Sequence, residues 1–395
     1  MSNFVAKNKM KTFVRVYFTI VTILLISTVS YGQYDSIQFD GYDRTYLLHL
    51  PDSYSGTDTL PLVIAMHGGF GSAYNLQDQS QLSEKANEEN FIVIYPEGLE
   101  NGVLNIRTWN AGWCCGNASS SNVDDVGFIN ALLDTLISQY PIDTNRVYAT
   151  GMSNGGFMSY RLACELSDRI AAIAPVAASL SMYDCNPERP VPIIEFHSYL
   201  DENVPYYGGI GSSGFSDHWN SPQDSVMNAW ANMDTCLVFN DTIVNNGQYT
   251  FIQWGNCSCL YEIHHYVTED GGHSWPGGVQ TATGDPVSIY INATDLMWSF
   301  FEQYSLECES LNYQEENFNS KSYISLFPNP SNGIVNIETS LQAGNFNIKV
   351  YNNTGEMIFR EANSKVIDLS DNAPGIYMVF IQTEKQLFTQ KFIIR

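Results

Sequence analysis

Ser153 stands between two glycines in the segment YATGMSNGGFMSY, residues 148–160. The pentapeptide GMSNG fits the pattern G-x-S-x-G, in which a sharp turn from a strand into a helix holds a serine hydroxyl clear of the backbone. The residues before it are β-branched and aromatic, and the residues after it are compatible with a helix. Ser153 is therefore either a nucleophile or only a small residue at a tight turn.

Residues that could activate Ser153 follow it in the sequence. A serine hydroxyl is a poor nucleophile until an imidazole takes its proton and a carboxylate holds that imidazole in the correct tautomer. Asp201 lies in the loop after the apolar run VPIIEFH, and His273 lies in the glycine-rich loop of HHYVTEDGGHSWPGG. The order serine, acid, histidine is that of the α/β-hydrolases. We therefore expect a catalytic triad of Ser153, Asp201 and His273, with a turn-forming role as the alternative for Asp201.

Other acidic and histidine side chains have structural explanations. Asp124 and Asp125 precede the serine at a predicted helix start, where capping and the helix dipole account for them. His197 lies on a predicted buried strand, and we expect it to be structural. Four other histidines lie in strand-like runs or have no accompanying partner, so they are not expected to be catalytic: His49, His218, His264 and His265.

Acyl transfer also needs backbone N–H groups that stabilise the developing oxyanion. In an elbow of this kind, one donor is the residue after the nucleophile, here Asn154, and another comes from a loop after an early strand. The glycine-rich segment MHGGFGSA supplies that loop, with Gly69 or Phe70 as the donor. The serine, the acid, the histidine and the glycine-rich loop fit one mechanism, which favours the nucleophilic interpretation of Ser153. That mechanism requires no metal or organic cofactor.

The elements that must position these residues alternate along the chain. From about residue 35 to 304, short apolar runs of strand type alternate with amphipathic helical segments, which predicts the α/β class, a mainly parallel sheet flanked by helices. A hairpin is expected at Asp40-Gly41. Predicted strands are LPLVIAM, FIVIYP, RVYATG, IAAIAPVAA and VPIIEFH, and predicted helices are NVDDVGFINALLDTLISQY, NGGFMSYRLACELSDR and ATDLMWSFFEQY.

The ends of the chain differ in character from its middle. Residues 1–32 combine a positively charged start, an apolar run from Val16 to Ile26 that is too short to span a bilayer, and a small-residue exit, which together indicate a secretory signal peptide. A retained membrane anchor is the alternative.

Residues 34–305 form the predicted catalytic domain. Residues 306–323 are polar and acidic, as in a linker. Residues 324–395 show alternating strands and turns without a helix, which predicts a small immunoglobulin-like β-sandwich.

Charge and cysteine content exclude some functions. Residues 1–32 hold four of the 18 basic residues and none of the 42 acidic ones, so the remaining chain has a net charge of −28, which disfavours binding to nucleic acid. Eight cysteines in an exported protein indicate disulfides. Neither Cys114-Cys115 nor Cys257-Ser258-Cys259 has a second pair at zinc spacing, so no metal site is predicted.

Several segments resemble a known family. PLVIAMHGG, TWNAGWCCGNA, VDDVGFINALL, RVYATGMSNGGFMS, AAIAPVAA, DENVPYYGG and GGHSWPGG are similar to the secreted polyhydroxybutyrate depolymerase and feruloyl esterase group, from about residue 40 to 304. The resemblance implies an α/β-hydrolase fold and hydrolysis of carboxylic esters, with Ser153, Asp201 and His273 at the triad positions. It also implies disulfides between Cys164 and Cys185 and between Cys236 and Cys257. One departure is Ser198, where the family usually has glycine.

The C-terminal segment has a resemblance of its own. FPNPSNGIVNI, KVYNNTGEMI and DLSDNAPGIYMVFI resemble the C-terminal sorting domain of the type IX secretion system of Bacteroidetes. This resemblance implies that the secretion machinery is a partner, that the protein is secreted or held at the cell surface, and that the domain is cleaved or retained there. An ordinary immunoglobulin-like binding module is the alternative.

The substrate is less well defined than the reaction. Trp109, Trp113, Trp219 and Trp275 lie in predicted loops or near the histidine, where indoles could bind sugars, phenolics or a polyester, although they could equally be packing residues. Polyester depolymerases of this group often carry an added polymer-binding domain, whereas this tail resembles a sorting signal. We therefore expect feruloyl or acetyl esters on plant polysaccharide, with polyhydroxybutyrate as the other polymer.

Two other functions remain as alternatives. A serine peptidase on the same fold is one, but the length before the hydrolase unit leaves no room for a second domain of propeller type. A non-catalytic surface binding protein is the other. Serine, aspartate and histidine are all present in the right order, which argues against a decayed site.

Overall fold

The computed structural model describes residues 33–101, 106–182, 184–213, 218–236, 238–281, 284–307, 324–339, 346–352, 357–382 and 387–395. The expected signal peptide, residues 1–32, and most of the expected linker lie outside these residues, as does Cys308. The chain divides into two compact units, with the division between Ser310 and Leu311.

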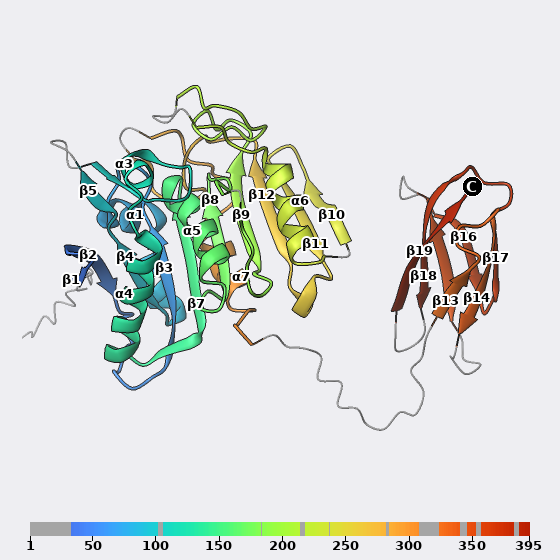
Figure 1. The fold of residues 1–395 in the computed structure, drawn as a ribbon, viewed down its shortest axis with the longest axis horizontal. Coiled ribbons are helices and arrows are strands. Elements are labelled where there is room, and N and C mark those ends of the chain that lie inside the picture. The colour runs from blue at the N-terminus through green and yellow to red at the C-terminus, as the bar shows by residue number, and fades with distance from the viewer. Residues whose placement is uncertain are drawn as a thin grey trace, which may run out of the picture. The chain divides into compact units, whose positions relative to one another are not determined.

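A ten-stranded sheet is the centre of the first unit (Figure 1). Its middle is parallel, and two antiparallel strands flank each side. The parallel strands are, in spatial order, β4 (Ile92–Pro96), β3 (Leu60–Met66), β7 (Ile142–Met152), β8 (Ala172–Val176), β9 (Ile193–Ser198) and β12 (Ile263–Thr268). The flanking strands are β1 (Gln33–Phe39), β2 (Tyr42–His49), β11 (Tyr249–Gly255) and β10 (Val238–Asn245). A separate ribbon pairs β5 (Leu99–Asn101) with β6 (Ile106–Thr108).

Helices cover both faces of this sheet. They are α1 (Ala73–Ser80), α2 (Leu82–Glu89), α3 (Gly116–Ser120), α4 (Asp125–Gln139), α5 (Asn154–Glu165), α6 (Gln223–Met233) and α7 (Ala293–Phe301), with a short 3₁₀ turn at Ser258–Leu260. Figure 1 shows α4, α5 and α6 in front of the sheet and α7 behind it. Lys85 of α2 and Asp295 of α7 form an ion pair of 2.6 Å, which joins these two helices. Among the described residues, the helices are too short or too polar to cross a membrane.

The α/β-hydrolase class expected from the sequence is the class observed. The central strands are continuous apolar runs because helices cover them on both faces, and every residue of β4 and β8 is buried. The hairpin between β1 and β2 turns at Asp40 and Gly41, whose φ angles of 49° and 79° suit a tight two-residue turn. The sequence pattern did not indicate α1, α2, α6 or the antiparallel pair of β10 and β11.

The second unit is built only of strands among its described residues. One sheet contains β13 (Ile324–Phe327), β14 (Ile334–Thr339) and β17 (Val366–Asp368), and the other contains β16 (Met357–Ala362), β15 (Asn347–Tyr351), β18 (Gly375–Gln382) and β19 (Leu387–Ile394). Buried residues alternate along the strands, and both sheets contribute to one core that includes Val335, Ile337, Ile348, Val350, Val379 and Ile381. This unit is therefore a small β-sandwich.

Candidate active site

Ser153 occupies the turn between β7 and α5. Its φ of 53° and ψ of −123° lie in a region that non-glycine residues rarely adopt, as expected for a strained elbow. Glycine at position 155 makes the turn possible, because the backbones approach so closely that a Cβ there would overlap the carbonyl oxygen of Met66 at the end of β3. The amide of Ser153 donates to the carbonyl of Val176, 2.9 Å away, which fixes the turn to the end of β8.

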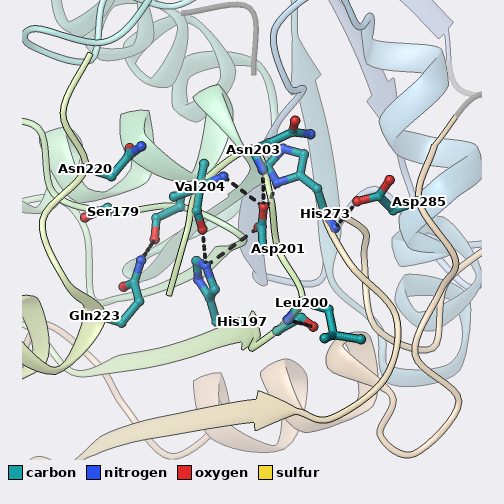
Figure 2. Close-up of polar contacts among 12 residues, drawn as sticks. Ser179, His197, Leu200, Asp201, Asn203, Val204, Asn220, Gln223, His273 and Asp285 are labelled. Carbon is teal, nitrogen blue, oxygen red and sulfur yellow. Dashed lines mark hydrogen bonds and ion pairs between the residues drawn. The ribbon is translucent and has the colours of Figure 1, made fainter. Parts of the chain in front are cut away.

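His273 and Asp201 meet in a direct contact. His273 Nδ1 lies 2.8 Å from Asp201 Oδ2, and the Asp201 side chain is fully buried, whereas 10% of the His273 side chain is exposed (Figure 2). Asp201 follows β9 and His273 follows β12, and these strands are parallel neighbours. The Ser153 elbow follows β7 of the same parallel series, so all three residues leave the sheet at the edge formed by the strands' carboxyl ends.

The carboxylate of Asp201 is fixed on both oxygens. Oδ1 accepts hydrogen bonds from the amides of Asn203 (2.9 Å) and Val204 (2.8 Å), while Oδ2 faces His273. Burial by itself would raise the pKa of Asp201, but the charge and hydrogen bond of His273, the charge of His197 and the Val204 amide outweigh it and hold the pKa below its usual range. Asp201 is therefore an ionised acceptor that can orient an imidazole.

The loop of His273 is held by a second carboxylate. The His273 amide donates to Asp285 Oδ2 over 2.7 Å (Figure 2). Sequence reasoning missed Asp285, because it lies in a loop twelve residues further along the chain without a recognisable motif. Among the described residues, no hydrogen bond joins Ser153 Oγ to His273; such contacts are often long without substrate and shorten in the complex.

The glycine-rich loop after β3 lies against the elbow. A Cβ at Gly68 would be 3.5 Å from Ser153 Cβ, and a Cβ at Gly69 would be 3.9 Å from Asn154 Cβ. The amide of Phe70 instead donates to the carbonyl of Arg107, 3.0 Å away. Phe70 is thus not available as an oxyanion donor in this structure, which corrects that expectation and leaves Gly69 and Asn154.

His67 shapes this loop and was not singled out in the sequence. It is buried, its Nδ1 lies 2.7 Å from the carbonyl of Gly68, and its Nε2 accepts from the amide of Gly98 (3.0 Å). Burial lowers the pKa of His67 to about 4, with a smaller opposing effect of the Gly68 carbonyl. The ring is therefore neutral at pH 7, with Nδ1 as donor and Nε2 as acceptor. The sequence signal that could have identified His67 is its position directly before the pair Gly68-Gly69.

The tryptophans proposed to bind substrate lie in different environments. Trp109 and Trp275 are fully buried, and their indole N–H groups donate to the His67 carbonyl and to Thr294 Oγ1, both at 3.0 Å. These two indoles are core residues with no exposed ring surface that a substrate could contact, so the expectation that they bind substrate is corrected. Trp113 is half-buried, and Trp219 is 65% exposed.

One exposed aromatic side chain in the segments that follow Asp201 was not indicated by the sequence. Tyr207 is 76% exposed and packs against Tyr206, with ring centroids 5.0 Å apart. A backbone bridge between Gly209 and Asn220 brings the segment after Tyr207 beside the segment that carries Trp219. Tyr207 and Trp219 are therefore exposed on two paired loops that follow Asp201 in the chain.

Three disulfides join cysteines among the described residues. Cys164 is bonded to Cys185 and Cys236 to Cys257, which are the pairs that the family resemblance implies. Cys114 is bonded to its neighbour Cys115. These two sulfurs and His218 are the cluster of potential metal ligands among the described residues. Because both sulfurs are in a disulfide, neither is a thiolate that could bind a metal.

Known proteins resemble both units. Residues 44–180 match the family described as Esterase PHB depolymerase, and residues 325–395 match the Secretion system C-terminal sorting domain. The chain is 30% identical over 272 residues to feruloyl esterase B of Piromyces equi, which covers 67% of this chain and 46% of that protein. It is 25% identical over 271 residues to a probable feruloyl esterase C of Aspergillus niger, which covers 65% of this chain and 83% of that protein.

A solved structure is also similar. The acetyl xylan esterase from Aspergillus awamori superimposes with a TM-score of 0.49 at 16% identity, over 69% of this chain and 99% of that one. The chain spans less than half the length of the Piromyces equi relative, 46% of it.

Proposed function

We propose that this chain, whose residues 44–180 match the family described as Esterase PHB depolymerase, is an exported serine hydrolase of carboxylic esters. The observation that carries the proposal is the contact of 2.8 Å between His273 Nδ1 and Asp201 Oδ2, at the sheet edge where the strained elbow presents Ser153. A buried carboxylate that orients an imidazole beside an elbow serine is the arrangement that activates a hydroxyl for attack on a carbonyl.

The first half of the reaction forms an acyl-enzyme. Ser153 Oγ attacks the ester carbonyl carbon, and His273 Nε2 takes the hydroxyl proton while Asp201 stabilises the imidazolium. The carbonyl oxygen becomes an oxyanion that accepts from the amides of Asn154 and Gly69. The tetrahedral intermediate then collapses: the bond to the alcohol oxygen breaks, and His273 gives its proton to the leaving alcohol.

The second half releases the acid. A water molecule attacks the acyl carbonyl, and His273 takes a proton from that water. The bond between the carbonyl carbon and Ser153 Oγ breaks, and the serine recovers its proton from His273. Water and ester give one alcohol and one carboxylic acid, and the enzyme returns to its starting state.

Feruloyl or acetyl esters of plant polysaccharide are the proposed substrates, and polyhydroxybutyrate is the other polymer to test. The names of the relatives support the first class, since they are a feruloyl esterase B and a probable feruloyl esterase C. The exposed rings of Tyr207 and Trp219 support a polymeric substrate, because flat aromatic surfaces pack against sugar rings and apolar chains alike.

The second unit determines where the reaction takes place. Residues 325–395 are a secretion system C-terminal sorting domain, so the protein is secreted or held at the cell surface. We propose that the domain binds the type IX secretion machinery and is then cleaved or retained. Export would bring the hydrolase to polymers that are too large to enter a cell.

The test compares the purified exported protein with two alanine variants. Acid release is followed from p-nitrophenyl acetate, methyl ferulate, feruloylated xylan and polyhydroxybutyrate. Ser153→Ala should lose activity by a factor of about 10³ or more, because the nucleophile is gone. Ser159→Ala is the matched control: this buried α5 hydroxyl only donates to the Gly156 carbonyl, so its loss should leave activity within about threefold.

Each outcome has a definite meaning. Activity that disappears with Ser153 supports the serine mechanism, and the preferred ester identifies the substrate class. Equal activity of wild type and Ser153→Ala would exclude Ser153 as the nucleophile. A wild type that is inert on all four esters would exclude the ester hydrolase and favour the peptidase or the binding protein.

A further inference from the structure

A second histidine, His197, lies beside the catalytic acid on the side away from His273. Its Nε2 is 3.6 Å from Asp201 Oδ2, the same oxygen that His273 contacts (Figure 2). Its side chain is fully buried. The triad mechanism does not use this ring, and a merely space-filling role would not need its two nitrogens.

Both nitrogens of His197 face hydrogen-bond acceptors. Nδ1 lies 2.9 Å from Glu195 Oε1, and Nε2 lies 2.8 Å from the carbonyl of Val204. A neutral imidazole has one N–H and one bare nitrogen, so it can donate to only one of them. An imidazolium donates to both, and its charge is balanced by Glu195 on one side and Asp201 on the other.

Three further titratable side chains lie around the pair of His197 and Glu195: His265, Tyr206 and Asp224. His265 of β12 lies opposite Glu195 in the strand register, with Nε2 2.9 Å from Glu195 Oε2. Tyr206 packs against the His197 ring with centroids 6.1 Å apart. The hydroxyl of Tyr206 donates to Asp224 of α6 over 2.8 Å, which adds a carboxylate to this region.

The same neighbours shift the pKa values of His197 and Glu195. Burial would lower the pKa of His197, but the charge and hydrogen bond of Glu195, followed by the charge of Asp201 and the Val204 carbonyl, raise it to about 9. Burial would raise the pKa of Glu195, yet the charges of His265 and His197 hold it below its usual range. These directions agree with the geometry.

We propose that His197 is a positioning residue of the ester-hydrolysing centre: a buried imidazolium that ties the Asp201 turn to Glu195 and keeps the Asp201 carboxylate ionised and aimed at His273. The catalytic consequence rests on the proposed function, whereas the charge of His197 does not. His197 does not touch the reacting atoms; it acts through Asp201.

The positive charge of His197 predicts the direction in which the pH profile of kcat/KM shifts when His197 is replaced. With His197 positive, part of the Asp201 charge is already balanced. In His197→Gln that positive charge is gone, and the Asp201 carboxylate attracts a protonated imidazole of the triad more strongly. The acidic limb of kcat/KM should therefore move upward by about one pH unit. At pH 7, kcat should fall roughly tenfold with KM changed less than about twofold.

The experiment measures kcat and KM from pH 5 to 9 for the exported protein and three variants. Glu195→Gln removes the partner of the imidazolium without changing side-chain size, and it should move the acidic limb in the same direction. His264→Gln is the matched control, because His264 lies on β12 next to His265 but pairs with Glu262 (2.9 Å), outside this cluster. It should leave the limb unchanged.

A direct measurement of the charge accompanies the kinetics. Nitrogen NMR of ¹⁵N-histidine-labelled protein at pH 7 should show His197 with both nitrogens protonated. The signal is assigned by its absence from His197→Gln. If that variant does not fold, it is assigned as the imidazole that shifts in Glu195→Gln and remains in His265→Gln.

The outcomes separate the two proposals. A bare nitrogen on His197 at pH 7 would overturn the imidazolium. An unmoved acidic limb in a folded His197→Gln, or in Glu195→Gln if the first variant does not fold, would overturn the positioning role. A wild type without ester activity would remove the proposed function, while the NMR result would still decide the charge of His197.

Discussion

Ser198 Oγ donates to the carbonyl of Asp270 over 3.1 Å. This hydrogen bond joins the end of β9, which leads to Asp201, to the loop after β12, which leads to His273. The same hydroxyl accepts from the amide of Leu200, 3.0 Å away. Ser198, which stands where the family that the sequence resembles usually has glycine, is thus a structural link between the loops that carry Asp201 and His273.

Replacing Ser198 by glycine should loosen both loops. The variant loses two hydrogen bonds at a buried site and gains backbone freedom, so we expect the free energy of unfolding to fall by about 1–2 kcal/mol. Urea unfolding of Ser198→Gly and wild type measures this, and steady-state kinetics should show kcat reduced less than about tenfold. A variant as stable as wild type would show that the link between the loops contributes nothing.

Asp201→Asn should nearly abolish catalysis without unfolding the protein. An asparagine Oδ1 can still accept from the amides of Asn203 and Val204, so the turn should persist. The amide nitrogen, however, would donate towards His273 and favour the wrong tautomer, with an expected loss of about 10³–10⁴ in kcat.

The matched control is Asp285→Asn. Its new side-chain oxygen can still accept from the His273 amide, and it does not face the imidazole. Its kcat should stay within about tenfold of wild type. Equal losses in the two variants would show that Asp201 has no special role in orienting His273.

Stability should fall as the pH rises from about 6.5 towards 9. His197, with its pKa raised to about 9, stabilises the fold fully below its unfolded pKa, and this stabilisation is lost as the pH approaches 9. Asp234 acts in the same direction: burial raises its pKa to about 8, against the Val191 amide and Arg189, so the unfolded chain releases that proton first. Thermal unfolding at pH 6.5 and 9 measures the fall.

The contribution of His197 can be isolated from that of Asp234. In His197→Gln the decline between pH 6.5 and 9 should be smaller than in wild type, because only Asp234 remains of the two groups. The control is His264→Gln, which should follow the wild-type curve. Parallel curves for wild type and His197→Gln would contradict a raised pKa of His197.

Loss of the exposed aromatic rings should affect polymers more than small esters. Tyr207 and Trp219 are exposed and do not fill the core, so the double variant Tyr207→Ala/Trp219→Ala should fold normally. We expect hydrolysis of feruloylated xylan to fall about tenfold and that of p-nitrophenyl acetate to change less than about twofold. An equal fall on both substrates would place the effect at the reacting centre instead of at a polymer-binding surface.

His67→Ala should weaken the loop that carries Gly69. The substitution leaves the amide of Gly98 and the carbonyl of Gly68 without their imidazole partner and opens a cavity. We expect a loss of about 2–4 kcal/mol in unfolding free energy and a larger effect on kcat than on KM. Unchanged kcat in a folded variant would show that the loop does not depend on His67.

The sequence by itself determined most of the central parallel strands, three of the helices that cover them (α4, α5 and α7) and the chain order of the candidate triad. Continuous apolar runs predicted the buried strands, because a strand that helices cover on both faces carries apolar side chains on both. The glycines around Ser153 predicted the elbow, because the backbones there come too close for a Cβ at Gly155. Both signals are local, so they can be read without knowing which strands become neighbours.

Only the tertiary structure decided which side chains meet and which are buried. Glu195 and His265 are 70 residues apart and lie opposite each other because β12 pairs with β9 in one register. The same register brings His197 and His273 to the two sides of Asp201. Loop position suggested accessible indoles at Trp109 and Trp275, but both loops fold over the core and bury them. Burial and long-range pairing depend on the packing of distant segments, which a local sequence pattern does not specify.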